Sequence, residues 1–295
     1  MKVVAVVGLG AMGSRIAGRL GASVDELRLF DPVEERCLAV ADATGGAFFA
    51  SAAEAASGAE AAVVVVADAG QADEALLGKH GVLAGLPAGG VVVVMSTIGP
   101  SAMASVGRRV LEAGFGIVDA PMTGGTALAE TGELLLFVSG RRGDVELVSP
   151  ILERCSRSWH FAGESLGAGQ TFKLVNQLLC SVHMMAAAEA LAFARALGLD
   201  QHEAFEAVKA GAGASFILEH YGERMIDGPY QPPSSAVPIL LKDSDLVAKE
   251  ARSRGLSVPA NDTAHDFFRR AVEAGLQNDD ITGVIRLYYK EMEEA

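Results

Sequence analysis

One face of a predicted helix gathers four side chains with hydrogen-bonding or reactive groups: Lys173, Asn176, Gln177 and Cys180. They stand at positions i, i+3, i+4 and i+7 of a stretch, residues 165–197, that contains no proline and is rich in Leu, Ala and Met. A lysine transfers protons when burial or a cationic neighbour lowers its pKa, and carboxamides orient hydroxyl groups. The pattern is compatible with a proton-transfer site and also with the solvent-facing stripe of an amphipathic helix.

A second candidate site is a glycine-rich sequence that follows the apolar run Lys2–Val7 and opens a predicted helix. An acidic residue, Asp31, ends the next apolar run, 18 positions after the last glycine. This arrangement is typical of a dinucleotide-binding turn, in which the helix N-terminus faces the pyrophosphate and the acidic side chain binds the adenosine ribose. The predicted cofactor contacts here are Gly8, Leu9, Gly10, Ala11, Met12, Gly13 and Asp31. An ordinary glycine-rich turn beside a surface aspartate is the alternative.

The charge of Asp31 bears on the choice of cofactor. A carboxylate repels the 2′-phosphate of NADP, and no arginine follows directly at positions 32 or 33, so NAD is favoured. Arg36 lies close to Asp31 in the sequence and could bind a 2′-phosphate, so NADP stays an alternative cofactor.

Two further polar loops follow predicted strands. Ser96 and Thr97 come after the strand 91–95, and Thr123, Gly124 and Gly125 come after the strand 117–120. Ligands of parallel α/β sheets bind at the carboxyl ends of the strands. A hydroxyl group beside exposed backbone amides suits a carboxylate, although a tight turn accounts equally for the Thr-Gly-Gly sequence.

The elements that position these residues alternate in type up to Gly163. The predicted strands are Lys2–Val7, Glu26–Phe30, Ala47–Ala50, Ala61–Val66, Val91–Met95, Ile117–Ala120, Leu134–Val138 and Trp159–Phe161. Helices of roughly ten residues separate most of them, and beyond Gly163 only helices are predicted. This order predicts an α/β fold with a Rossmann-type, doubly wound parallel sheet in residues 1–163. An all-α domain in residues 164–295 follows, joined by the long helix.

Composition limits the classes of function. The net charge of −13 argues against nucleic acid and anionic membrane surfaces as partners. The three cysteines are distant from one another and odd in number, which excludes a disulfide framework and suits the reducing cytoplasm. The histidines show no metal-ligand spacing, and no signal peptide follows Met1. We therefore expect a soluble cytoplasmic protein without a metal site.

Four motifs occur in a fixed order: GLGAMG at 8–13, DAPMTGG at 119–125, GAGQTFKLVNQ at 167–177 and Lys-Asp at 242–243. With them the chain resembles the β-hydroxyacid dehydrogenase family, which includes 3-hydroxyisobutyrate dehydrogenase and tartronate semialdehyde reductase. The resemblance covers essentially the whole chain. It implies an NAD(P)-binding Rossmann domain, a linking helix, an all-α domain that often builds a homodimer or homotetramer, and a small hydroxyacid or semialdehyde substrate.

The resemblance also implies roles for individual residues. Lys173 matches the family's catalytic lysine, a general acid and base. The proposed substrate contacts are Thr123, where the family usually has serine, Gly124 and Gly125 at the carboxylate, and Asn176 and Gln177 at hydroxyl groups. Gln177 departs from an asparagine of the family. The implied cofactor contacts are Val66, Ala67, Gln71, Thr97 and Lys242, with Val66-Ala67 in place of a common Leu-Pro turn.

Within the family, the C-terminal half is most similar to the L-threonate dehydrogenase branch. Ser235, seven residues before Lys242, replaces the phenylalanine of many relatives, which suits a polar sugar acid. The alternatives are a 3-hydroxyisobutyrate dehydrogenase and a tartronate- or glyoxylate-type semialdehyde reductase. A non-catalytic nucleotide-binding sensor is an alternative from another class, which the presence of Lys173 disfavours.

Overall fold

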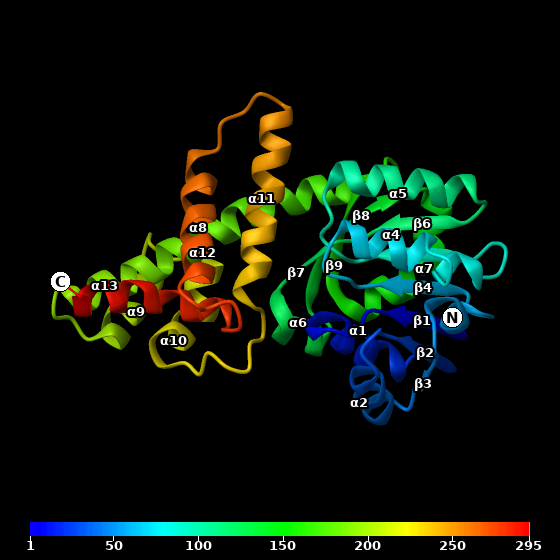
Figure 1. Ribbon diagram of the computed structural model, residues 1–295, viewed down its shortest axis with the longest axis horizontal. Coiled ribbons are helices and arrows are strands. Elements are labelled where there is room, and N and C mark those ends of the chain that lie inside the picture. The colour runs from blue at the N-terminus through cyan, green and yellow to red at the C-terminus, as the bar shows by residue number, and fades with distance from the viewer. Residues whose placement is uncertain (295) are drawn as a thin grey trace. The chain divides into compact units, whose positions relative to one another are not determined.

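A computed structural model of the protein describes residues 1–294. The chain divides into two compact units, the first formed by Met1–Lys173 and the second from Leu174 onward. Figure 1 shows a sheet with flanking helices in unit 1 and helices alone in unit 2. The predicted Rossmann-type fold followed by an all-α region is confirmed.

Unit 1 contains a nine-stranded sheet with the order β3-β2-β1-β4-β5-β6-β8-β7, and β9 pairs with β8. The strands are β1 (Val3–Val7), β2 (Glu26–Phe30), β3 (Ala47–Phe48), β4 (Ala61–Val64), β5 (Val91–Val94), β6 (Gly116–Asp119), β7 (Met122–Thr123), β8 (Leu134–Gly140) and β9 (Ser156–Gly163). The strands from β3 to β6 are parallel, as predicted.

One part of the sheet departs from the prediction of parallel strands. β8 runs antiparallel to both β6 and β7. The connection from β6 to β8 contains only the short strand β7 and the helix α6 (Gly125–Thr131). A parallel pairing needs a crossover that returns the chain to the other end of the sheet. This connection makes no such return, so β8 begins at the edge where β6 ends.

Alternate residues of the strands pack against helices on opposite faces of the sheet. Val4 and Val6 of β1 belong to one core cluster, and Ala5 and Val7 belong to the other. The first cluster includes α1 (Ala11–Gly21), α2 (Glu34–Thr44), α6 and α7 (Arg142–Cys155). The second includes α3 (Ala52–Ala56), α4 (Ala69–Leu77) and α5 (Pro100–Glu112). Coverage of both faces explains why these strands are continuous apolar runs in the sequence.

The long helix α8 (Ala168–Ala196) begins in unit 1 and continues into unit 2. The other helices of unit 2 are α9 (Gln201–Lys209), α10 (Phe216–Asp227), α11 (Val237–Ser253), α12 (Pro259–Glu273), the 3-10 helix η2 (Ile281–Ile285) and α13 (Arg286–Glu294). Their core contains large apolar side chains such as Met184, Leu191, Phe205 and Phe268. The sequence of residues 281–292 predicts a single helix, whereas the structure has the 3-10 turn η2 followed by α13.

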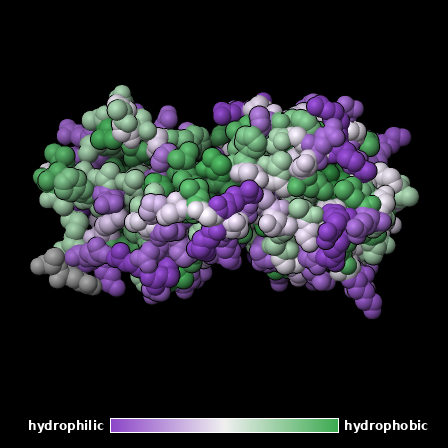
Figure 2. All heavy atoms as spheres, turned by 90° about the horizontal axis from the view of Figure 1, so that it is seen from above, coloured by the Kyte–Doolittle hydropathy of each residue, from purple (hydrophilic) through white to green (hydrophobic). Residues whose placement is uncertain are grey.

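Among the described helices, α8 alone is long and apolar enough to cross a membrane, judged by length and composition. Its most apolar window is 44% buried, and core helices of soluble proteins meet the same criteria, so this is weak evidence for a membrane span. Met184, Ala188 and Leu191 of α8 face the core of unit 2. Val175 and Phe193 are exposed, and Figure 2 shows hydrophobic side chains on the surface of this unit.

Candidate active site

The glycine-rich turn between β1 and α1 leaves no room for side chains at two of its three glycines. Gly8 has φ +90°, and a Cβ there would lie 2.2 Å from the carbonyl oxygen of Val65. A Cβ on Gly13 would lie 1.9 Å from the carbonyl oxygen of Gly8. At Gly10, by contrast, no heavy atom lies within 4 Å of an added Cβ. The turn is therefore tight where α1 packs against it and open beside Gly10, as close approach of a pyrophosphate requires.

Asp31 is joined to this turn. It follows β2 and is 6% exposed. Its Oδ2 accepts a hydrogen bond from Leu9 N–H (2.7 Å), and its Oδ1 accepts one from Val33 N–H (2.9 Å). Arg36 Nη1 lies 3.5 Å from Oδ1. The structure thus brings the predicted residues Leu9 and Asp31 together, with one cationic side chain beside the carboxylate.

The predicted contacts after β4 lie together in a second loop. Val66 N–H donates to Ser96 Oγ (2.7 Å), and Ala67 N–H donates to Gln71 Oε1 (3.0 Å). Gln71 is in the first turn of α4, whose N-cap Asp68 accepts its backbone N–H. Ser96 precedes Thr97 directly. The loops after β4 and β5 are therefore connected by a side-chain hydrogen bond at the carboxyl end of the sheet.

The turn after β6 has a backbone that glycine specifies. Gly124 has φ +133° and Gly125 has φ +76°, values that side chains strongly disfavour. A Cβ on Gly124 would lie 3.0 Å from Leu128 Cδ1. Thr123 is the last residue of β7. The expected tight turn is present, and its use as a carboxylate site stays a prediction.

Sequence reasoning missed a buried polar cluster at the start of α8. Gln170 and Asp119 are both fully buried, and Gln170 Nε2 donates to Asp119 Oδ1 (2.7 Å). Asp119 Oδ2 accepts from Gln170 N–H (3.1 Å) and from Ser139 Oγ (3.0 Å). Burial raises the pKa of Asp119 to about 6, and the hydrogen bonds from Gln170, Ser139 and Gly167 limit the rise. Lys173, 6% exposed, follows Gln170 by one helical turn.

The signal for this cluster in the sequence was weak. Asp119 belongs to the DAPMTGG motif and Gln170 to the GAGQTFK motif, but neither was given a role. A glutamine three positions before a lysine has no distinctive pattern, and Ser139 lies inside an apolar strand. Only the fold brings the three side chains together.

Unit 2 contains a separate polar group around Asp243, a buried residue that was not predicted as a site residue. Gln177 Nε2 donates to Asp243 Oδ2 (2.5 Å), and Lys242 Nζ lies 2.8 Å from Asp243 Oδ1. Asn176 Nδ2 donates to Gln177 Oε1 (2.9 Å). The structure therefore brings three predicted residues together, Asn176, Gln177 and Lys242. Asp243 fixes the Gln177 side chain.

Helix α8 carries Lys173, Asn176 and Gln177 on consecutive turns. Their spacing of three and four residues places them along one face of the helix. Lys173 is the last residue of unit 1, whereas Asn176 and Gln177 belong to unit 2.

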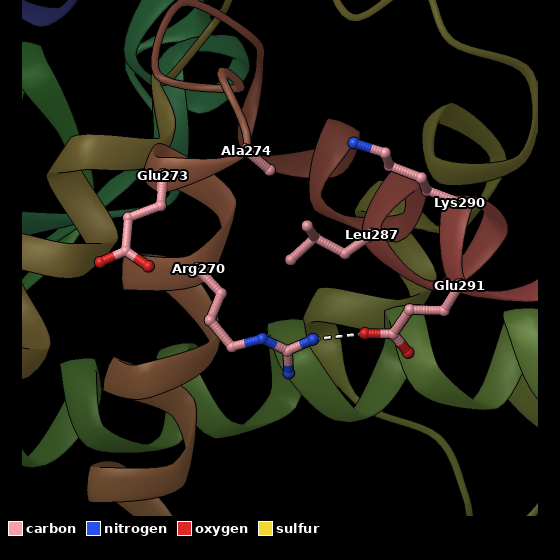
Figure 3. A pocket seen from close by; sticks show the side chains of 6 residues that line it. All are labelled: Arg270, Glu273, Ala274, Leu287, Lys290 and Glu291. Carbon is pink, nitrogen blue, oxygen red and sulfur yellow. Dashed lines mark hydrogen bonds and ion pairs between the residues drawn. The ribbon is translucent and has the colours of Figure 1, made fainter. Parts of the chain in front are cut away.

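A pocket of about 350 Å³ in unit 2 contains none of the predicted residues. Figure 3 shows that its lining is mixed in charge, with an ion pair between Arg270 and Glu291 across from Leu287 and Lys290. Arg270 and Glu291 are paired with each other, and both side chains are about half exposed. It lacks the buried polar groups expected of a catalytic site. Among the side chains that the structure describes, residues 1–292, no cluster of three or more His, Cys, Asp or Glu is arranged to hold a metal ion.

Comparison with known proteins covers nearly the whole chain. Residues 3–163 match the NAD binding domain of 6-phosphogluconate dehydrogenase, and residues 167–288 match the NAD-binding family of NADP-dependent 3-hydroxyisobutyrate dehydrogenase. An L-threonate dehydrogenase of Cupriavidus necator is 34% identical over 97% of this chain and 95% of its own. A 2-hydroxy-3-oxopropionate reductase of Escherichia coli is 30% identical over 92% of each chain.

The fold agrees with these similarities. The crystal structure of a 3-hydroxyisobutyrate dehydrogenase from Salmonella typhimurium has a TM-score of 0.89 and 31% identity, covering 97% of this chain and 100% of its own. The relatives are dehydrogenases and reductases of hydroxyacids, and both domain families are named for NAD binding. The protein is an NAD(P)-dependent hydroxyacid dehydrogenase, and its chain belongs to the 3-hydroxyisobutyrate dehydrogenase-like family of β-hydroxyacid dehydrogenases.

Proposed function

We propose that this enzyme oxidises a small sugar acid such as L-threonate at C2, with NAD as hydride acceptor and Lys173 as general acid and base. The observation behind the substrate is that five L-threonate dehydrogenases are 32–34% identical to the chain over 97% of its length. Ser235 supports it, because a hydroxyl group in place of an aromatic ring leaves a more polar and roomier pocket for a polyol.

In this proposal, Lys173 Nζ takes the hydroxyl proton as hydride leaves C2, and returns it to the carbonyl oxygen in the reverse reaction. The lysine is 6% exposed, so bulk water competes little for that proton. Bound NAD supplies the carbon that accepts the hydride. Thr123 Oγ and the amides of Gly124 and Gly125 hold the substrate carboxylate, and Asn176 with Gln177 orients its hydroxyl groups.

The residues that we propose to bind the cofactor belong to unit 1, apart from Lys242. The residues proposed to hold the dinucleotide are Gly8, Leu9, Gly10, Ala11, Met12, Gly13, Asp31, Val66, Ala67, Gln71, Thr97 and Lys242. The open space beside Gly10 and the buried carboxylate of Asp31 fit a pyrophosphate and a ribose. Asp31 disfavours a 2′-phosphate, and Arg36 is the side chain that would bind one if NADP is used.

The position of Ser235 is defined by Asp280. Ser234 Oγ and N–H donate to Asp280 Oδ2 (2.6 and 2.7 Å), and Ile281 N–H donates to the carbonyl oxygen of Ser235 (2.8 Å). Asp280 is fully buried, which by itself raises its pKa, but the hydrogen bonds from Ser234 and Thr282 hold the pKa of this carboxyl below its usual value. The segment that presents Ser235 is therefore fixed by charge-assisted hydrogen bonds, as a specificity residue requires.

We also propose that residues 1–163 form the cofactor domain and residues 164–295 the substrate and oligomerisation domain of a soluble, cytoplasmic homodimer or homotetramer. The exposed Val175, Leu179 and Phe193 of α8, and the exposed Leu197 directly after it, support self-association. The charge of −13 supports the absence of nucleic-acid and membrane partners. Light scattering on the purified chain measures the oligomer.

The deciding experiment is an absorbance assay of NADH or NADPH formation with L-threonate, D-glycerate, 3-hydroxyisobutyrate, 4-hydroxybutyrate and tartrate. We expect the highest kcat/KM with L-threonate and NAD⁺. Strong preference for glycerate or 3-hydroxyisobutyrate would overturn the substrate and favour a semialdehyde reductase or 3-hydroxyisobutyrate dehydrogenase. Cofactor binding without turnover of any hydroxyacid would favour the sensor.

A further inference from the structure

Gln170 has a hydrogen-bond partner for every polar position of its side chain. Oε1 accepts from Ile98 N–H (2.9 Å) and Gly99 N–H (3.0 Å). Nε2 donates to the carbonyl oxygen of Ser96 (3.0 Å) and to Asp119 Oδ1 (2.7 Å). A carboxamide offers two donors and two acceptor sites, and all four are used here. Such complete pairing in a fully buried side chain fixes its orientation.

The partners of Gln170 belong to segments that carry the proposed cofactor contacts. Ser96 and Ile98 flank Thr97 in the loop after β5. Ser96 Oγ in turn accepts Val66 N–H, at the end of β4. One glutamine on α8 is thus connected to both loops, although it is 72 residues away from Ile98 and 74 from Ser96 in the sequence.

The hydrogen bonds between Gln170 and Asp119 fix the beginning of α8 itself. Asp119 accepts both the side-chain and the backbone N–H of Gln170, and Ser139 Oγ accepts Gly169 N–H (3.1 Å). A carboxylate at a helix N-terminus is favoured by the helix dipole. At Gly169 an added Cβ would lie 2.4 Å from the carbonyl oxygen of Phe137, so the first turn packs directly on β8.

We infer that Gln170 is a positioning residue, which holds the α8 turn bearing Lys173 in register with the loops bearing Thr97 and Val66. This inference rests on the proposed role of Lys173. Lys173 follows Gln170 by three residues, so a tilt of this turn moves its side chain relative to the loops. Small errors in the placement of a catalytic group cost roughly 10²-fold in rate.

The test compares Gln170→Leu with a matched change, Gln201→Leu, in purified full-length enzyme. Gln201 also donates two side-chain hydrogen bonds, to the Leu191 carbonyl oxygen and Tyr289 Oη, but it lies in unit 2 on α9. We expect Gln170→Leu to lower kcat at least about tenfold while the Kd of NADH rises less than about threefold, because misplacement affects the rate more than binding. Gln201→Leu should lower the thermal midpoint without this loss of kcat. Unchanged kcat in folded Gln170→Leu would overturn the inference.

A second pair of variants covers the case in which Gln170→Leu does not fold. Gln170→Glu keeps an acceptor for Ile98 and Gly99 but places a carboxylate against Asp119, so kcat should fall. Adding Asp119→Asn supplies a donor to the new carboxylate and should restore part of the lost kcat. If the kcat of the double variant does not exceed that of Gln170→Glu alone, the hydrogen bond between Gln170 and Asp119 does not have the assigned role.

Amide hydrogen exchange separates this inference from the proposed function, because it needs no turnover. Gln170→Leu should speed exchange in peptides covering residues 96–99, because the Ile98 and Gly99 amides lose their acceptor. If wild-type enzyme oxidises no hydroxyacid, the proposed function fails while the exchange result still reports on Gln170. Unchanged exchange at residues 96–99 in Gln170→Leu would show that Gln170 does not hold this loop.

Discussion

Two regions of unit 1 prepare the proposed cofactor site in different ways. The glycine-rich turn is mostly local: a Cβ on Gly13 would meet the carbonyl oxygen of Gly8 within the same turn and helix start, whereas a Cβ on Gly8 would meet Val65, just after β4. The Gln170 network, formed by Ser96, Asp119, Ser139 and Gln170, joins residues up to 74 positions apart. The turn depends on the absence of side chains, whereas the network depends on side chains whose polar groups are all paired. The first leaves a pattern in the sequence and the second does not.

Substitutions in the two regions should also have different effects. An added methyl group in the turn meets backbone atoms at Gly8 and Gly13, or at Gly10 it occupies open space that we propose for the cofactor. A lost partner in the network leaves a buried polar group unpaired, at a cost of about 1–3 kcal/mol. Substitutions in the turn should therefore act on cofactor binding, and substitutions in the network on rate, stability and their dependence on pH.

The largest effect on kcat is expected from a substitution outside both regions, at Lys173. Lys173→Ala removes the proposed proton acceptor and should lower kcat roughly 10³-fold, within the range of general acid–base catalysis. The Kd of NADH, measured by fluorescence titration, should change less than about threefold, because the turn and the network are intact. Lys249→Ala, on an exposed part of α11, is the control. A Lys173→Ala enzyme with near-wild-type kcat would exclude the assigned role.

The next largest effect is expected on NADH binding, and it separates a glycine in the turn, Gly10, from a glycine in the helix that follows, Gly18. Neither Gly10 nor Gly18 has a heavy atom within 4 Å of an added Cβ. Gly10→Ala should weaken NADH binding at least about tenfold, because the methyl group enters the space where the backbone must approach the pyrophosphate. Gly18→Ala, inside α1, should bind NADH normally and gain slightly in stability. Equal affinity in both variants would show that the dinucleotide does not lie at Gly10.

The smallest effect concerns the pH dependence of stability in the network. Burial raises the pKa of Asp119 from 3.8 to about 6, so the folded state holds this proton more tightly than the unfolded state. The stabilising contribution is complete below the unfolded pKa and is lost as pH rises through about 6. The thermal midpoint of wild type minus that of Asp119→Asn should therefore decrease between about pH 4 and pH 7.

An exposed aspartate gives the control of opposite sign. The hydrogen bond from Arg269 lowers the pKa of Asp266, so its contribution is lost as pH falls instead. Thermal midpoints of Asp266→Asn over the same pH range should show a small difference from wild type that does not decrease with rising pH. If the Asp119→Asn difference is also flat, Asp119 does not titrate in this window.

Much of the fold follows from residue patterns. Continuous apolar runs such as Val3–Val7 and Val91–Val94 predicted the central strands, and the 3.6-residue period predicted α8. The patterns missed β7 and α6, which are too short for a period to show, and they could not give the direction of β8. Direction depends on the path of the connection rather than on the strand itself.

The sequence by itself determined the glycine-rich turn, the acidic residue after β2 and the spacing of Lys173, Asn176 and Gln177, because each depends on local backbone geometry. Only the tertiary structure decided that Gln170 meets Ser96 and Asp119, and that Gln177 meets Asp243 across 66 residues. A buried hydrogen bond needs its two partners at one point in space, and nothing in the local sequence of either partner records the position of the other.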